Sequence, residues 1–289
     1  MELAVIHLLA EVNYAFEIFD DIEEIIEVIV MTADVHHKSE HILLTLQRTH
    51  GVNFIEGILL QDDKVNDFGF PELLARQGVV KKTSLEAYSR PRTNGVNAIN
   101  IREDDELLEA ILTNGRCNIM IAANGGRCVR FDETEARPLG RTSTGVRGIN
   151  LDEGDFVVGV VSQDPEADDA AKHQVLAVSE NGFGKRSDPN DYRQTARGAK
   201  GVRTLNITEK TGKLVAIKNV TDEDDLMIIC RSGLTIRMPV STIRVAGRAT
   251  QGVKLINIKE GDAIAAISVV AHSEDEESQA AEPVETAEE

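Results

Sequence analysis

Short apolar runs separated by turn residues recur through the middle of the chain. Residues 119–123, 175–178 and 226–230 are such runs, and the first two are closely followed by Asn124-Gly-Gly and Asn181-Gly. Asn-Gly beside an apolar run is the strongest short signal for a β-hairpin. The pattern predicts an all-β segment of successive hairpins, with further strands at 156–161 and 263–267.

Four copies of one block divide this segment into units of about fifty residues. Each block reads Gly-Val-x-x-Ile/Leu-Asn-Ile/Leu and is followed by an acidic turn and a second apolar run. The four anchor glycines are Gly95, Gly145, Gly201 and Gly252. A unit of about fifty residues with roughly four strands has the size of a propeller blade, and single blades must stack to bury their faces. We predict an all-β, propeller-like array of four blades over residues 71–272, in which the anchor blocks are core strands.

Basic residues keep fixed positions within the unit. One position lies four residues after a second recurring glycine and is occupied by Lys82, Arg130, Arg186 and Arg237, with Lys81 and Lys185 beside it. A basic loop then precedes each anchor glycine, and its residues are Arg90, Arg92, Arg137, Arg141, Arg193, Arg197, Lys200, Arg244 and Arg248. Because stacked repeats present equivalent loops on the same side, we expect these side chains to line one outer rim.

The distribution of charge permits such a basic rim despite a net charge of −18. Residues 1–70 carry 14 acidic and 3 basic side chains, and residues 273–289 carry 8 acidic and none basic. The middle of the chain, 71–272, is balanced, with 27 acidic and 28 basic side chains. Basic side chains can therefore form a continuous face if the two signs are sorted in space.

Three stretches around the anchor glycines carry a family resemblance. They begin Ser89-Arg-Pro-Arg, Arg137-Pro-Leu-Gly-Arg and Val245-Ala-Gly-Arg, and they resemble blades of the C-terminal domain of DNA gyrase A over roughly residues 76–272. The equivalent domain of topoisomerase IV is the close relative. The resemblance implies a β-pinwheel, a propeller whose blades exchange strands, with double-stranded DNA wrapped around a basic outer rim. It also implies a cytoplasmic partnership with the B subunit of gyrase and the rest of gyrase A in a heterotetramer that supercoils DNA.

The sequence departs from the family in two respects. The breakage-reunion domain is missing, and Tyr14, Tyr88 and Tyr192 stand in no motif matching its catalytic tyrosine. We therefore expect this chain to be inactive alone and to hold no cofactor, since the full enzyme uses ATP and magnesium through other domains. The family's Gln-Arg-Arg-Gly-Gly-Lys-Gly signature is also missing, and its nearest counterpart is Ala196-Arg-Gly-Ala-Lys-Gly. The missing signature bears on the expectation of strong wrapping and supercoiling, and contact with DNA is still expected.

Composition indicates which kind of nucleic acid the rim would bind. The chain has no tryptophan, which argues against stacking of single-stranded bases, and no recognition helix for a major groove is apparent in the repeats. We expect sequence-tolerant contacts from lysine and arginine to phosphates, with bending of the duplex. The alternatives are a topoisomerase IV domain that bends DNA and a propeller that binds protein. No motif supports an independent enzyme.

The remaining candidate sites have simpler interpretations. Asp34, His36, His37 and His41 have a spacing that could ligate a metal, but a lone polar cluster is more often solvated. The repeated Glu-Gly-Asp sequences predict hairpin turns rather than a carboxylate site. Three cysteines, Cys117, Cys128 and Cys230, predict small core residues in a reducing compartment and no disulfide framework. No apolar run predicts a membrane span, and the N-terminus does not resemble a signal peptide.

The two acidic ends stand apart from the array. Residues 1–70 combine a helical spacing of isoleucines at 22, 25, 26 and 29 with a worn repeat around Gly51, and are either a diverged blade or a foreign segment. Residues 273–289 predict a disordered acidic tail. The tail is either a solubilising end or a DNA mimic that folds back on the rim.

Overall fold

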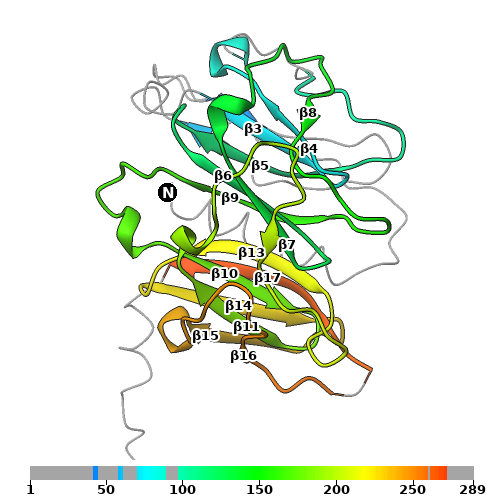
Figure 1. The fold of residues 1–289 in the computed structure, drawn as a ribbon, viewed down its shortest axis with the longest axis vertical. Helices are drawn as coiled ribbons and strands as arrows, with labels where there is room; N and C mark the ends of the chain where they lie inside the picture. The colour runs from blue at the N-terminus through cyan, green and yellow to red at the C-terminus, as the bar shows by residue number, and fades with distance from the viewer. Residues whose placement is uncertain (1–41, 45–57, 61–69, 89–96, 260, 272–289) are drawn as a thin grey trace, which may run out of the picture.

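The computed structural model describes residues 42–44, 58–60, 70–88, 97–259 and 261–271, and within them the fold is all-β. A small two-stranded sheet pairs β1 (Ile42–Leu44) with β2 (Ile58–Leu60). Four further antiparallel sheets follow along the chain as the blades of a propeller-like array (Figure 1). The predicted four-bladed β-fold is therefore confirmed.

Each blade contains three strands from one repeat. Blade 1 holds β3 (Phe70–Ala75), β4 (Val79–Lys82) and β5 (Leu107–Thr113), and blade 2 holds β6 (Asn118–Ala123), β7 (Arg127–Asp132) and β9 (Val157–Gln163). Blade 3 holds β10 (Gln174–Ser179), β11 (Phe183–Ser187) and β13 (Leu214–Val220), and blade 4 holds β14 (Asp224–Cys230), β15 (Thr235–Pro239) and β17 (Ile264–Ala271). A short 3-10 turn follows each hairpin: η1 (Leu85–Tyr88), η2 (Glu133–Glu135), η4 (Pro189–Asp191) and η5 (Val240–Thr242). A further turn, η3 (Ala170–Lys172), precedes β10.

The outermost strand of each of the first three blades comes from the following repeat. These strands are β8 (Val146–Arg147), β12 (Val202–Arg203) and β16 (Val253–Lys254), and the sheet orders are β5-β3-β4-β8, β12-β7-β6-β9 and β13-β10-β11-β16. They coincide with the anchor blocks, which the sequence analysis assigned to the core. That assignment is corrected in part, because the strands form the outer edges of the sheets, and burial begins after them, where the apolar residues Ile149, Leu205 and Ile256 enter the core.

A glycine in the hairpin turn of each of blades 1 to 3 lets the exchanged strand pass close by. Gly126 has φ +78°, and a Cβ there would lie 2.7 Å from the carbonyl oxygen of Leu205. Gly126 O in turn accepts a hydrogen bond from Thr204 N at 2.9 Å. A side chain at this position would therefore displace the exchanged strand, as well as strain the turn.

The hydrophobic core is shared between neighbouring blades. β6 is buried along its whole length, and Ile121 packs with Leu74 and Val80 of the blade before it. The innermost strands also contact in sequence, β5 with β9, β9 with β13 and β13 with β17. Cys117, Cys128 and Cys230 are unpaired and buried, as predicted, and burial raises their thiol pKa values, to about 11 for Cys117 and about 12 for Cys128.

Candidate nucleic-acid interface

Three loops, which we call the connectors, form the outer edges of blades 1 to 3. They are residues 137–148, 193–204 and 244–255, and each runs from the 3-10 turn of its own blade onto the blade before it. An amide of each connector donates a 2.8 Å hydrogen bond to the edge strand that it covers: Leu139 N to Lys82 O, Thr195 N to Arg130 O and Ala246 N to Arg186 O. This contact places the connector side chains at the periphery of the sheets, where the predicted rim should be.

The first arginine of every connector is exposed. Arg137, Arg193 and Arg244 occupy equivalent positions just before the connector pairs with the preceding blade. Within the residues that the structure describes, no hydrogen bond or ion pair engages these three guanidinium groups. They are therefore available to an external anion, and a guanidinium can make two parallel hydrogen bonds to a phosphate.

The second arginine of each later connector ties its connector to the one before. Arg197 Nη1 donates to Arg147 O at 2.5 Å and Arg197 Nε to Glu135 O at 3.1 Å. Arg248 repeats this arrangement in the next unit, with bonds of 2.8 Å to Arg203 O and 2.9 Å to Asp191 O. Both side chains remain partly exposed, and Arg141, at the same position of the first connector, is half-buried.

A third basic position lies on the exchanged strands themselves and was missed by the sequence analysis. It is occupied by Arg147 in β8, Arg203 in β12 and Lys254 in β16, all of which are exposed. The signal was present in the anchor blocks, which read Gly-Val-Arg, Gly-Val-Arg and Gly-Val-Lys. Adjacent residues on a strand point to opposite faces of the sheet. When the valine of the anchor block points inward, the basic residue after it therefore points outward.

Successive connectors touch, so their basic residues form one track rather than three separate patches. Arg197 contacts the backbone of Arg147, and Arg248 contacts the backbone of Arg203. Backbone bonds join the same segments: Asn150 N donates to Ala199 O at 3.0 Å and Asn206 N to Thr250 O at 3.1 Å. We call the exposed and half-exposed basic residues of the three connectors the rim track.

The basic residue after the recurring glycine does not belong to the rim track, which corrects the prediction for three blades. Lys82 and Arg186 are buried, and Arg130 is half-buried. Each reaches across to the 3-10 turn of the following blade: Lys82 to Glu133 at 2.5 Å, Arg130 to Pro189 O at 2.8 Å and Arg186 to Ile243 O at 2.8 Å. These side chains hold one blade to the next, which explains why the position is basic in blades 1 to 3.

The remaining members of the predicted second basic point also have internal partners. Lys81 and Lys185 are fully buried, and their ammonium groups donate to backbone carbonyls. Lys81 donates to Ala98 of its own repeat and Arg141 of the next, and Lys185 donates to Gly247 of the next repeat. Burial lowers the pKa of both lysines to about 8. Arg237 of the last blade donates to Asp225 of its own sheet at 2.8 Å. Lys81 and Lys185 were expected on the rim and lie inside the array instead.

Lys200, Arg90 and Arg92 were also predicted to line the rim. Lys200 is exposed in the second connector, but its ammonium forms an ion pair with Asp152, and this contact lowers the pKa of the Asp152 carboxyl. Arg90 and Arg92 lie outside the described residues. The polar cluster at Asp34, His36, His37 and His41, which we interpreted as solvated, lies outside them as well. So do the helical spacing at residues 22–29 and the acidic tail at 273–289.

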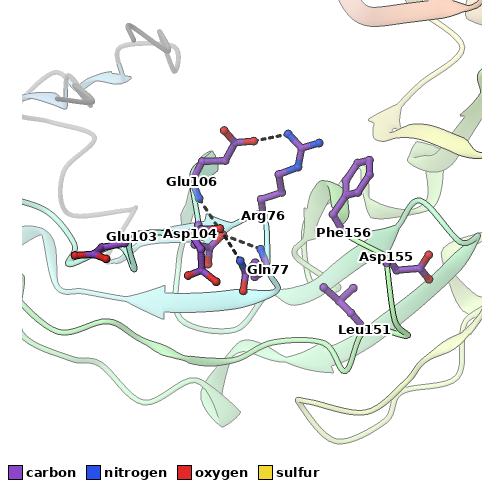
Figure 2. A pocket seen from close by; sticks show the side chains of 10 residues that line it. Arg76, Gln77, Glu103, Asp104, Glu106, Leu151, Asp155 and Phe156 are labelled. Carbon is purple, nitrogen blue, oxygen red and sulfur yellow. Dashed lines mark hydrogen bonds and ion pairs between the residues drawn. The ribbon is translucent and has the colours of Figure 1, made fainter. Parts of the chain in front are cut away.

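The acidic turns are not hairpin turns, which corrects the prediction: residues 152–155, for example, join β8 of blade 1 to β9 of blade 2, and these two strands do not pair. The carboxylates of such turns instead support the neighbouring hairpin turns. Asp105 Oδ1 accepts hydrogen bonds from Gln77 N and Glu106 N, both at 2.9 Å. Figure 2 shows the groove of about 690 Å³ beside this turn, where Arg76 pairs with Glu106 and lies 4.2 Å from the ring centre of Phe156. Its lining is rich in carboxylates, which repel phosphates, so this groove is not part of a nucleic-acid surface.

The described part of the chain holds no candidate metal centre. No group of three or more His, Cys, Asp or Glu side chains in it could hold a metal ion. The hydroxyl of Tyr192 is buried 2.6 Å from Thr204 Oγ1, and its pKa is raised by burial, which disfavours a nucleophilic phenolate. No described helix is long and apolar enough to span a membrane.

Fold and rim together define a class: a strand-exchanged β-propeller whose exchanged strands carry a basic track along the outer edge. The family described as "DNA gyrase C-terminal domain, beta-propeller" matches the chain at residues 73–114, 118–164, 173–221 and 224–271, one match per blade. These matches cover more than half of the sequence. The chain belongs to this family.

Curated relatives agree with this assignment, and two solved structures share the fold. The DNA gyrase A protein of Staphylococcus epidermidis (strain ATCC 12228) is 40% identical over 240 residues, or 79% of this chain and 26% of the relative, and that of Staphylococcus aureus (strain MRSA252) is 40% identical over 244 residues, or 81% and 27%. The chain thus spans about a quarter of the length of these curated relatives. A crystal structure of the C-terminal domain of DNA topoisomerase IV has a TM-score of 0.69 at 23% identity, covering 78% of this chain and 68% of that one. A DNA gyrase A C-terminal domain has a TM-score of 0.62 at 21% identity, covering 74% and 70%.

Proposed function

We propose that this chain is a non-catalytic module that binds and wraps double-stranded DNA for a bacterial DNA gyrase. The observation that carries the proposal is the rim track, in which Arg197 and Arg248 join three basic connectors end to end. Phosphates lie at regular spacing along a duplex, so a continuous line of cations can follow one DNA backbone and release its condensed counterions. Contacts of this kind do not read base sequence.

In this proposal, other polypeptide segments carry out the catalytic steps of supercoiling. Strand cleavage and ATP hydrolysis need a nucleophile and a nucleotide site, and this chain would contribute neither. It would act beside gyrase B and the rest of gyrase A in the cytoplasm and would hold no cofactor of its own. Identity of 40% with gyrase A over most of the chain favours gyrase over topoisomerase IV as the parent enzyme.

Replacement of the first arginine of each connector tests the proposal. We expect the triple variant R137A/R193A/R244A to bind a duplex of about 150 base pairs at least tenfold more weakly at low salt, irrespective of sequence. The slope of log affinity against log salt should fall by up to about 3, since three phosphate contacts are lost. Fluorescence anisotropy across a salt series measures both quantities.

A matched control removes the same charge from elsewhere on the surface. Lys172, Lys213 and Arg231 are exposed and lie outside the connectors, so K172A/K213A/R231A should bind DNA nearly as the unmodified chain does. Equal losses in the two triple variants would show that net charge rather than the rim track governs binding. Absence of DNA binding by the unmodified chain at low salt would refute the proposed function.

A further inference from the structure

Blade 2 places two arginines opposite each other where it pairs with its exchanged strand. Arg127 in β7 is the register partner of Arg203 in β12, so both side chains stand on the same face of the sheet. Both are exposed. Like charges directly opposite each other on neighbouring strands repel, so this pair weakens the junction unless an anion compensates it.

The equivalent positions of the neighbouring blades avoid this repulsion. In blade 1 the exchanged Arg147 lies opposite Val79, and in blade 3 the exchanged Lys254 lies opposite Phe183. An apolar neighbour can pack against the aliphatic stem of a basic residue without repelling its charge. The arginine pair is therefore a feature of blade 2 and not a requirement of strand exchange.

The two arginines line one groove of about 190 Å³. Gly125 and Gly126 of the β6–β7 turn form part of its wall, and they contribute only backbone atoms. Asn206 also lines the groove, and its Oδ1 accepts a hydrogen bond from Arg203 Nη1 at 3.3 Å, which orients that guanidinium. The groove therefore offers hydrogen-bond donors and enough space for a phosphate group.

Nearby carboxylates leave the arginine pair with an excess of positive charge. Asp152 Oδ2 lies 3.7 Å from Arg127 Nε, but the same carboxylate pairs more closely with Lys200. Within the described part of the chain, no carboxylate pairs with Arg203. Asp155 lines the groove of Figure 2 instead. Three cations thus share one carboxylate, and their excess charge attracts an anion.

We propose that Arg127 and Arg203 together bind one phosphate group in this groove. Each guanidinium presents paired N–H groups that match phosphate oxygens, so the two side chains can hold one phosphate from two sides. The bound anion also offsets the repulsion across the strand junction. The phosphate is either part of a duplex that follows the rim track past Arg203 or a free phosphate, and only the first source rests on the proposed function.

Titration of the full 289-residue chain with inorganic phosphate tests the site without DNA. The readout is the backbone amide NMR shifts of residues 125–127 and 203–206, compared with sodium chloride at equal ionic strength. We expect saturable shifts at roughly millimolar phosphate. Arg127→Val should abolish them, and the strand should still pair because this change copies the valine that lies opposite Arg147 in blade 1.

DNA binding distinguishes the two sources of phosphate. If the phosphate belongs to a duplex, Arg127→Val should weaken binding several-fold and lower the slope of log affinity against log salt by about 1. Addition of Arg203→Ala should then cost less than the sum of the two single losses, because both arginines contact one phosphate. Loss of the phosphate shifts with unchanged DNA binding would assign the site to free phosphate.

Arg231→Ala is the matched control, since Arg231 is exposed in the equivalent hairpin turn of blade 4. We expect this variant to keep the phosphate shifts at residues 125–127. Shifts that are absent or never saturate would overturn the proposal, and so would an equal loss in Arg127→Val and Arg231→Ala. Because this titration contains no DNA, its failure is distinguishable from a failure of the proposed function, which the salt series on the unmodified chain tests.

Discussion

Basic side chains at two positions of the repeat bind different partners. Arg186 is buried and donates to the turn carbonyls of Ile243 and Ser241 in the next blade, whereas Arg244 is exposed at the start of a connector. A buried cation needs fixed acceptors because its desolvation is costly, while an exposed one remains hydrated until a phosphate approaches. Chemistry alone does not distinguish the two residues, and their surroundings decide their role.

The buried pair of Lys82 and Glu133 leads to a prediction about stability. Lys82→Met leaves the Glu133 carboxylate in the interior without its cation, and loss of one partner of a buried pair costs about 3–5 kcal/mol. We expect urea unfolding to show a loss of this size. DNA affinity, measured where the variant is still folded, should not change because the Lys82 side chain is buried and is not part of the rim track.

The double variant K82M/E133Q separates this explanation from a packing defect. Neutralising the carboxylate removes the unpaired charge, so part of the lost stability should return. The glutamine side chain could still accept from Cys117 N through its carbonyl oxygen and donate from Nε2 to the Thr113 hydroxyl, so both groups that now bond to Glu133 would keep a partner. If the double variant were less stable than K82M, the buried charge would not be the cause.

At the scale of elements, each connector contributes both to the stability of the fold and to the proposed DNA interface. Its backbone completes the preceding sheet, and its side chains supply the rim track. Gly201 marks the closest approach: with φ +72°, a Cβ would lie 2.2 Å from Cys128 O. Backbone cannot retreat from such a contact without breaking the pairing of Val202 with Cys128.

Gly201→Ala should therefore lower the free energy of unfolding by about 3 kcal/mol or more, through the clash and the positive φ together. Gly247→Ala is its control, since a Cβ on Gly247 meets nothing within 4 Å, and we expect a change within about 0.5 kcal/mol. Chemical denaturation of both variants measures the difference. Equal stabilities would mean that the connector can move outward freely.

The blades could be predicted from the sequence, but the placement of every basic side chain could not. Asn-Gly turns and the regular anchor blocks are local signals, so hairpins and blade number could be predicted from them. Lys81 and Lys82 show the limit, because neighbours on a strand normally face opposite sides and one should be exposed. Both are buried, since a connector covers one side and blade 2 covers the other. Such coverage depends on backbone from the next repeat, which no local pattern reveals.

At the scale of the whole molecule, charge is sorted by structural layer. The connectors place arginine and lysine at the sheet edges, while carboxylates gather at the turns that lead to the innermost strands, as at Asp105 and Glu106. A net charge of −18 does not prevent DNA binding when exposed cations such as Arg137, Arg193 and Arg244 lie along one track, even though Asp152 pairs with Lys200 in the second connector. Screening over about 10 Å at moderate salt limits repulsion from distant carboxylates.

The path of the rim track leads to a topological prediction. If a duplex follows the track around the array, it is coiled as well as bent, and closed circular DNA relaxed by a type I topoisomerase in the presence of this chain should change its linking number. Gel electrophoresis of the deproteinised topoisomers measures this change. R137A/R193A/R244A should give none at the same concentration. Tight binding without a shift would favour the bending mode of the topoisomerase IV alternative.

Exchange of the outermost strands also sets an order for folding during synthesis. β4 emerges from the ribosome well before Val146 and Arg147, which form the β8 strand that covers it. Each hairpin therefore waits, with its backbone groups open to water and to other nascent chains, until the following repeat has been translated. Translation pauses within a repeat would prolong this exposure, so the timing of elongation becomes a determinant of yield for a protein of this architecture.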